Sequence, residues 1–136
     1  MSSHPMTPTT LIDAARQFTN AFNENNLDGV MEWFASDSVY DQFDGAQAKG
    51  RDEIRTAFEP QFAGAFGVMK FNEEELFVDV VERKAMISWT CSLESKRGTA
   101  SWRGLDLLIF DEQLKITRKS TYAKAKTLNL EGAAQD

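Results

Sequence analysis

Two aspartates occupy positions where a carboxyl group could carry out acid–base chemistry. Asp41 ends the run from Ser38 to Asp41, and Asp106 interrupts residues 102–110, the most apolar strand-like stretch of the chain. If Asp106 points into a core, its charge must be paired or its proton retained, because burial disfavours an isolated charge. A site that holds one neutral and one ionised carboxyl holds an acid and a base side by side. The two aspartates are therefore the strongest functional lead in the sequence.

The composition predicts one compact domain with an aromatic core. The chain has 136 residues, of which 42% are apolar, and it contains ten Phe and three Trp. A chain of this length buries about two thirds of its unfolded surface, so no disulfide or metal is needed to hold the fold. The single cysteine, Cys91, excludes an intramolecular disulfide and fits a reducing compartment. A buried apolar role for its thiol is favoured over a nucleophilic one, because no histidine lies nearby.

Charge and targeting signals exclude several classes of function. The only histidine, His4, lies in the N-terminal leader, which excludes histidine triads and histidine metal sites. Without a glycine-rich dinucleotide motif or a metal-ligand set, we expect no cofactor and no metal. The net charge of -6 disfavours nucleic acid as a partner. No membrane-spanning run or signal-peptide core is present, which predicts no membrane partner and a cytoplasmic location. We interpret the basic residues near the C-terminus as a solvated strand face: Lys115, Arg118, Lys119, Lys124 and Lys126.

The N-terminal half has the spacing of helices. We expect a flexible leader over residues 1–8, one domain over residues 9–126 and a C-terminal tail over residues 127–136. Thr10 and Asp13 have the spacing of a capping box and predict a helix that runs to about Glu24. A short helix over residues 27–34 and a strand over residues 38–42 follow. A third helix begins at Arg51, and Pro60 is expected to kink or end it.

The C-terminal half changes to strands. Apolar runs over residues 76–81, 85–93, 99–110 and 114–122 are separated by short polar turns, which predicts an antiparallel meander. The fold class is therefore α+β, with about three N-terminal helices packed on one face of a curved, mainly antiparallel sheet. Both faces of residues 101–110 are largely apolar, so we expect a second subunit to cover the outer face and form a homodimer.

Strand alternation indicates which side chains line the space between helices and sheet. Trp102, Gly104 and Asp106 share one face of their strand, and Gly104 leaves room in the floor. The space would suit a flat, hydrophobic small molecule that carries one or two oxygens. An equally good alternative is that these aromatic side chains simply fill a core. The expected lining residues are Phe18, Phe22, Phe58, Trp89, Cys91 and Trp102, with Tyr122 as a further hydrogen-bond donor.

These residues resemble a known family, the nuclear transport factor 2-like superfamily, and in particular its ketosteroid isomerase and SnoaL-like polyketide cyclase branches. The resemblance is carried by residues 21–41, 50–55 and 104–110 and by Leu114 to Ile116, in the order of the family. It implies a cone-shaped fold in which the helices and the curved sheet enclose a pocket. The superfamily includes enzymes, carriers and assembly domains, so the resemblance indicates the fold more strongly than the function.

The resemblance also implies roles for the two aspartates. Asp41 matches the aspartate that shuttles the proton in ketosteroid isomerases, and Asp106 matches the protonated aspartate of their oxyanion hole. In the cyclase branch, an aspartate that matches Asp106 acts as the acid/base. Phe18 and Phe58 stand where the isomerase has tyrosines, and the loss of one oxyanion donor costs roughly 100- to 1000-fold in rate. We therefore expect an enzyme of this branch that is not a true steroid isomerase.

Three functions remain open at this point. The first is an enzyme in which Asp41 and Asp106 transfer a proton next to the carbonyl of a hydrophobic cyclic substrate, in an isomerisation, cyclisation or dehydration. The second is a binding module that keeps the aromatic pocket, with Asp106 as a structural group and Asp41 as a solvent-facing aspartate at a strand end, before the turn at Asp44 and Gly45. The third is a dimeric assembly domain that uses the outer sheet face.

Overall fold

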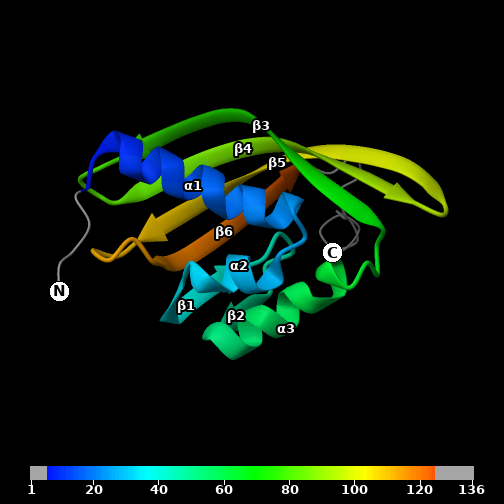
Figure 1. Cartoon of the computed structure of the whole chain (residues 1–136), viewed down its shortest axis with the longest axis horizontal. Coiled ribbons are helices and arrows are strands. Elements are labelled where there is room, and N and C mark those ends of the chain that lie inside the picture. The colour runs from blue at the N-terminus through cyan, green and yellow to red at the C-terminus, as the bar shows by residue number, and fades with distance from the viewer. Residues whose placement is uncertain (1–5, 125–136) are drawn as a thin grey trace, which may run out of the picture.

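The computed structural model describes residues 6–124, which form three helices and one six-stranded sheet (Figure 1). The helices are α1 (Pro8–Asn23), α2 (Leu27–Glu32) and α3 (Arg51–Phe62), and none of these described helices is long and apolar enough to cross a membrane. The predicted tail, residues 1–5 of the predicted leader and Lys126 lie outside the described residues. The strands are β1 (Phe34–Asp41), β2 (Gln47–Lys49), β3 (Val68–Asp79), β4 (Lys84–Ser95), β5 (Gly98–Phe110) and β6 (Ile116–Lys124).

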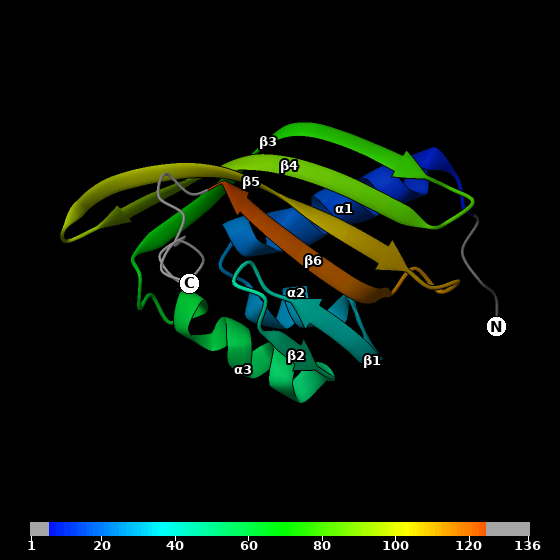
Figure 2. The same ribbon diagram turned by 180° about the vertical axis from the view of Figure 1, so that it is seen from behind.

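The sheet is mixed and does not close on itself. Its strand order is β2-β1-β6-β5-β4-β3, in which β1 and β6 run parallel and all other neighbours run antiparallel. The helix α1 lies across one face of the long strands, and the view from behind shows these strands with no helix in front of them (Figures 1 and 2). The predicted α+β fold, with three N-terminal helices on a curved, mainly antiparallel sheet, is confirmed.

The first helix begins about one turn earlier than predicted. Its N-cap is Thr7, whose hydroxyl accepts a hydrogen bond from the Thr10 backbone N–H at 3.2 Å, while the Thr10 hydroxyl accepts one from the Thr7 N–H at 3.0 Å. Pro8 follows at the first helical position, where its missing N–H costs nothing. The capping box proposed for Thr10 and Asp13 is therefore wrong, because Thr10 closes the box that Thr7 opens.

The third helix presents its apolar side to the sheet. Ile54 and Phe58 are buried on this side. Gly50 caps the helix at φ 84°, in the left-handed region that favours glycine. Pro60 lies inside the last turn, and the helix ends at Phe62, two residues after it. The helix therefore ends within two residues of Pro60, in agreement with the prediction that this proline kinks or ends it.

Phenylalanine rings hold the helices on the sheet. The ring of Phe22 in α1 lies 5.2 Å from that of Phe58 in α3 and 5.9 Å from that of Phe71 in β3, both edge to face. Phe18 in turn packs against Phe22 at 5.2 Å and against Phe34 at 5.6 Å. Such edge-to-face pairs add stability beyond the apolar area that they bury. This packing fixes α1 and α3 over the strands that carry the site described below.

A bulge at the start of β6 sets which side chains of that strand face the helices. Phe110 pairs with Ile116, but Ile109 pairs with Arg118, so Thr117 is an extra residue in the strand. Ile116 is buried, and regular alternation from it would place Arg118 and Tyr122 inside. The extra residue reverses this order, so that Lys119 faces inward and is buried, while Tyr122 is 55% exposed.

Candidate functional site

A cavity of about 830 Å³ lies between the helices and the sheet. Its walls come from α1, α3 and the concave sides of five strands, and its rim comes from the turn after β1 and the loop after α3. Most of the wall is apolar and aromatic, and the polar side chains gather where β5 and β6 run side by side. The residues that line it are Thr19, Phe22, Tyr40, Gln42, Phe43, Asp44, Ala57, Phe58, Gln61, Phe66, Met69, Phe71, Trp89, Ser101, Trp102, Asp106, Lys119, Thr121, Ala123 and Lys124.

Five of the residues predicted from the sequence line this cavity. The aromatic part of the wall includes Phe22, Phe58, Trp89 and Trp102. Asp106 supplies a carboxyl group. Trp89 and Asp106 are only 3% and 7% exposed, so both belong to the deep part of the cavity. The structure therefore brings together the aromatic cup and one of the two predicted catalytic aspartates.

Three predicted binding residues lie elsewhere. Phe18 is buried between Phe22 and Phe34, in the core. Cys91 is also fully buried outside the cavity lining, and burial raises the pKa of its thiol to about 11. Tyr122 lies on the outer sheet face, because the bulge in β6 turns Lys119 and Thr121 toward the cavity instead. These three placements correct the predicted lining of the cavity.

Asp106 is held by three donors. Its Oδ2 accepts a hydrogen bond from the Trp89 indole Nε1 at 3.2 Å, and its Oδ1 accepts one from the Thr121 hydroxyl at 2.6 Å. The Lys119 ammonium lies 3.1 Å from the same Oδ1. The three contacts leave neither carboxyl oxygen of Asp106 without a partner. The cation that a buried Asp106 charge would need is therefore present, in Lys119.

Lys119 is a buried cation inside an aromatic cage. Its Nζ lies 4.4 Å from the centre of the Tyr40 ring, 5.6 Å from that of Phe58 and 5.7 Å from that of Phe22, and it donates to the Thr121 hydroxyl at 2.6 Å. Burial by itself lowers the pKa of Lys119, but Asp106 and Tyr40 outweigh this effect and hold the pKa above its ordinary value. Lys119 is therefore a permanent positive charge at neutral pH.

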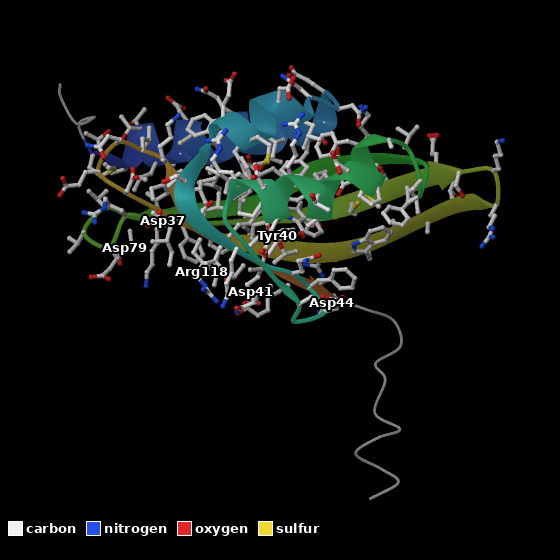
Figure 3. All side chains as sticks on the ribbon, turned by 90° about the horizontal axis from the view of Figure 1, so that it is seen from below. Asp37, Tyr40, Asp41, Asp44, Asp79 and Arg118 are labelled. Atoms are coloured by element: carbon white, nitrogen blue, oxygen red, sulfur yellow. The ribbon has the colours of Figure 1, made fainter. Side chains whose placement is uncertain are left out.

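Asp41 lies on the opposite side of the sheet from Asp106. In β1, Tyr40 is buried and lines the cavity, so alternation turns Asp41 away from it. Figure 3 shows Tyr40 on the helix side and Asp41 beside Arg118 on the outer side. The two outer side chains form an ion pair at 3.5 Å and are both partly exposed. Asp41 and Asp106 therefore do not share one cavity, which an enzyme that uses both aspartates would require.

The sequence analysis missed Lys119, Thr121 and Tyr40. Lys119 was interpreted as part of a solvated basic face, although it belongs to the buried face of β6. A signal was present in the register, because Thr121 pairs directly with Asp106 and shares its side of the sheet with Lys119. This register could have been predicted only if the position of the bulge were known. Nothing in the sequence around Thr117 indicates a bulge there. Tyr40 precedes Asp41 in β1, and strand alternation turns it toward the cavity while Asp41 points outward.

Gly104 makes room for the tryptophan that holds Asp106. A Cβ atom at this position would lie 2.5 Å from Cη2 of the Trp89 indole and 2.5 Å from the Tyr122 carbonyl oxygen. The indole therefore lies directly against the β5 backbone, which only glycine permits. This close approach fixes the direction in which the Trp89 Nε1 points at Asp106.

Within residues 6–124, no three His, Cys, Asp or Glu side chains lie together as a metal site would require. The buried charged groups of the cavity are the Lys119 ammonium and the Asp106 carboxylate, with the Thr121 hydroxyl between them. The cavity is also lined by Asp44, Lys124, Gln42 and Gln61. The buried set can bind a carbonyl or enolate oxygen and exchange a proton with a neighbouring carbon.

Comparisons with known proteins agree with this architecture. The protein chain matches no curated protein sequence. Solved structures share its fold: AusH from Aspergillus nidulans is similar with a TM-score of 0.78 at 16% identity, covering 92% of this chain and 90% of that one. An NTF2-like protein of unknown function from Mesorhizobium loti has a TM-score of 0.72 at 22% identity, with coverage of 92% and 100%.

A third similar structure is SalBIII, an epoxide hydrolase/cyclase-like enzyme with a role in pyran ring formation in the polyether salinomycin. Its TM-score is 0.75 at 12% identity, and the match covers 85% of this chain and 92% of that one. At such identities these structures show the fold alone. The profile of the SnoaL-like domain matches residues 15–119, most of the chain. The chain therefore belongs to the SnoaL-like domain family.

Proposed function

We propose that this protein is an enzyme that transfers a proton next to the carbonyl group of a hydrophobic cyclic substrate. The observation that supports this most is the buried pair of Lys119 and Asp106, 3.1 Å apart, at the deep end of an aromatic cavity. A purely structural core has little use for such a pair, since apolar side chains of similar size stabilise a fold at least as well. Perturbed, buried charges in a cavity are typical of functional sites.

In the proposed reaction, the two charged groups have separate tasks. The substrate carbonyl oxygen accepts a hydrogen bond from the Lys119 ammonium. Asp106 accepts a proton from the neighbouring carbon: the C–H bond breaks, an O–H bond forms on Asp106, and the electron pair moves to the oxygen as an enolate. Lys119 stabilises that negative charge, and Asp106 then returns the proton to another carbon or to the leaving group.

The walls of the cavity indicate the shape of the substrate. A volume of about 830 Å³ lies within the range of cavities that hold drug-sized molecules. Phe22, Phe58 and Trp89 present flat apolar surfaces, which suit a cyclic or polycyclic molecule with few oxygens. The role of SalBIII in pyran ring formation is in keeping with a cyclic product.

Asp41 has no part in this proposal, although the resemblance to ketosteroid isomerases implied a catalytic role for it. Its carboxylate pairs with Arg118 on the outer side of β1 and β6. The base is instead Asp106, which matches the acid/base of the cyclase branch. The oxyanion donor is Lys119, which stands in for the hydroxyl groups that Phe18 and Phe58 lack.

Deuterium uptake tests the proposal. A panel of cyclic ketones, led by 2-tetralone, is incubated with the protein in D2O, and exchange at the carbon next to the carbonyl is followed by NMR. We expect faster exchange than in buffer, a loss of about 100-fold in Asp106→Asn, and full activity in Asp41→Asn, which is matched in residue type. If Asp106→Asn does not fold, the double variant Asp106→Asn, Lys119→Met takes its place, because it removes both charges together.

Two results of this experiment contradict the proposal. Exchange that survives in the Asp106 variants but disappears in Asp41→Asn would move the chemistry to the outer face. A protein that binds the ketones but exchanges none of them would support the non-catalytic binding module.

The outer sheet face favours a second proposal, a homodimer. Phe77, Met86 and Leu107 pair directly across β3, β4 and β5 and form an apolar row, of which Phe77 is 63% and Leu107 41% exposed. Tyr122 extends the patch onto β6. Apolar side chains that gather on one open sheet face mark an interaction surface more often than scattered ones do. A dimer formed through this face would leave the cavity on the other side free for catalysis. The cytoplasmic location remains a prediction from the sequence.

A further inference from the structure

The cavity changes in character from its deep end to its rim. At the deep end, Lys119 and Trp89 are 4% and 3% exposed, and Phe58 is 2% exposed. At the rim, Phe43 is 69% and Phe66 is 52% exposed, although both line the same cavity. The exposure of the lining residues thus orders the cavity from an inner end with the buried Lys119 to a mouth with two exposed phenylalanine rings, where Asp44 and Lys124 are exposed as well.

Hydrogen-bonded turns present the two rim phenylalanines. Phe43 lies in the turn between β1 and β2, where the Gln42 N–H donates to the Ala46 carbonyl at 2.9 Å and the Ala46 N–H donates to Oδ1 of Asp44 at 3.0 Å. Phe66 lies between α3 and β3, where the Gly67 N–H donates to the Gly64 carbonyl at 3.2 Å. The backbones that carry both rings are therefore fixed by the fold.

Glycine at position 67 fastens the second turn to the sheet. Gly67 has φ 113°, and a Cβ atom there would lie 2.3 Å from the Glu94 carbonyl oxygen of β4. The close approach of the two backbones sets Phe66 at the mouth of the cavity. A loop that served only to join α3 to β3 would not need a large apolar side chain beside this contact.

Packing within the fold does not account for the two rings. Among the described residues, neither Phe43 nor Phe66 makes a ring pair of the kind that joins Phe22 to Phe58 at 5.2 Å. One exposed apolar side chain is ordinary, but two at the mouth of one cavity form a surface that gains from contact with an apolar molecule. The cavity also exceeds the space that a two-ring molecule at its charged end would fill.

We propose that Phe43 and Phe66 form an outer apolar subsite that binds the end of the substrate far from its reacting carbonyl. The inference rests on the proposed function, because it places the carbonyl at Lys119 and Asp106. It narrows the substrate class to elongated molecules, in which a second ring system or an apolar chain extends from the reacting ring to the mouth. Phe43 and Phe66 thus determine the length specificity of the enzyme.

The test compares two phenols that mimic the enolate and differ only in length. The dissociation constants of 2-naphthol and of 6-phenyl-2-naphthol are measured by calorimetry for the wild type, Phe43→Ala, Phe66→Ala and the double variant. Phe77→Ala is the matched control, because Phe77 is a phenylalanine 63% exposed on the other face of the sheet. Circular dichroism confirms that each variant is folded, which the high exposure of the three rings favours.

We expect the wild type to bind the longer phenol at least about tenfold more tightly than 2-naphthol. Phe43→Ala and Phe66→Ala should each remove several-fold of that advantage, and the double variant most of it. Binding of 2-naphthol should stay unchanged in the rim variants, and Phe77→Ala should leave both constants as they are.

Each other outcome has a definite meaning. An advantage for the longer phenol that persists in the double variant, or that falls equally in Phe77→Ala, overturns the outer subsite alone. Binding of 2-naphthol that does not weaken in Lys119→Met overturns the proposed oxyanion site, whatever the rim variants show. If neither phenol binds the wild type, both inferences are overturned.

Discussion

Lys119 and Asp106 are the residues on which the proposed chemistry depends. Each would be unfavourable alone in this position, since burial disfavours an isolated ammonium as much as an isolated carboxylate. Together, at 3.1 Å and with Thr121 bonded to both, they form a satisfied polar group in an aromatic surrounding. The pair gives the cavity a donor and an acceptor that a ligand can reach from one side.

The first prediction concerns the cost of breaking this pair. Lys119→Met leaves the Asp106 carboxylate buried without its cation and should lower the free energy of unfolding by about 3 to 5 kcal/mol, measured by urea denaturation. Arg118→Met is the matched control on the adjacent residue, where the ion pair with Asp41 is partly exposed and should contribute no more than about 1 kcal/mol. Equal losses in the two variants would contradict the buried pair.

A second prediction at this scale is the alkaline dependence of stability. The fold holds the pKa of Lys119 above the ordinary value of 10.5, so the folded chain binds this proton more tightly than the unfolded chain does. The resulting stabilisation is fully present below pH 10.5 and is lost as the pH rises through the folded pKa. The difference in unfolding free energy between wild type and Lys119→Met should therefore shrink above that pH. A difference that stays constant would show that Lys119 is not the group concerned.

The sequence was informative about residue types and less so about which charges meet. An aspartate in the apolar stretch 102–110 predicts a buried carboxyl with a partner or a proton, and the structure supplies the partner. That partner could not be read from the sequence, because Lys119 stands among other basic residues that are partly or fully exposed. The resemblance to ketosteroid isomerases supplied a role for Asp41, but the alternation of β1 places the neighbouring Tyr40 in the cavity instead.

At the scale of elements, helices and long strands follow local patterns that the sequence shows. The apolar spacing of α1 and the short turns on either side of β4 predict these elements. The run predicted over residues 76–81, however, covers only the end of β3, which begins at Val68. Two features could not be predicted from local sequence patterns, because they depend on pairing between segments that are far apart in the chain. The parallel pairing of β1 with β6 joins the two halves of the chain, and the bulge at Thr117 depends on the register of β6 against β5.

The third prediction concerns the close contact between β4 and β5. Gly104→Ala places a methyl group against the Trp89 indole and the Tyr122 carbonyl, so it should cost about 1 to 3 kcal/mol and displace the indole from Asp106. Its affinity for 2-naphthol should fall as well. Gly98→Ala is the control, because a Cβ there meets nothing within 4 Å and carries only the backbone cost of φ 122°. Unchanged naphthol binding in Gly104→Ala would contradict the role of Trp89 in positioning Asp106.

At the scale of the whole molecule, the sheet separates two surfaces of different chemical character. Its concave side, with α1 and α3, holds the cavity, and its outer side carries the apolar row and the ion pair of Asp41 with Arg118. The sequence predicted that both faces would be apolar, and this follows from the alternation of β5. The face that carries the proposed site is the one toward which Asp106, Lys119 and Thr121 point. The register of β6 against β5 determines that direction.

The fourth prediction is that the outer face forms a dimer. Sedimentation equilibrium of the wild type should give twice the mass of one chain, and Leu107→Glu should give a monomer, because it places a charge in the apolar row. Val81→Glu is the control, since Val81 is 84% exposed in the turn between β3 and β4. A wild-type monomer, or a dimer that Leu107→Glu leaves intact, would contradict the proposed interface.

The most direct test of the whole account is a crystal structure of the protein with 2-naphthol bound. We expect the naphthol oxygen to lie within hydrogen-bond distance of the Lys119 ammonium and the Asp106 carboxylate. Its rings should lie against Phe22, Phe58 and Trp89, with the far edge directed toward Phe43 and Phe66. A naphthol seated on the outer face near Asp41 and Arg118, or held in the cavity with its oxygen away from Lys119, would contradict it.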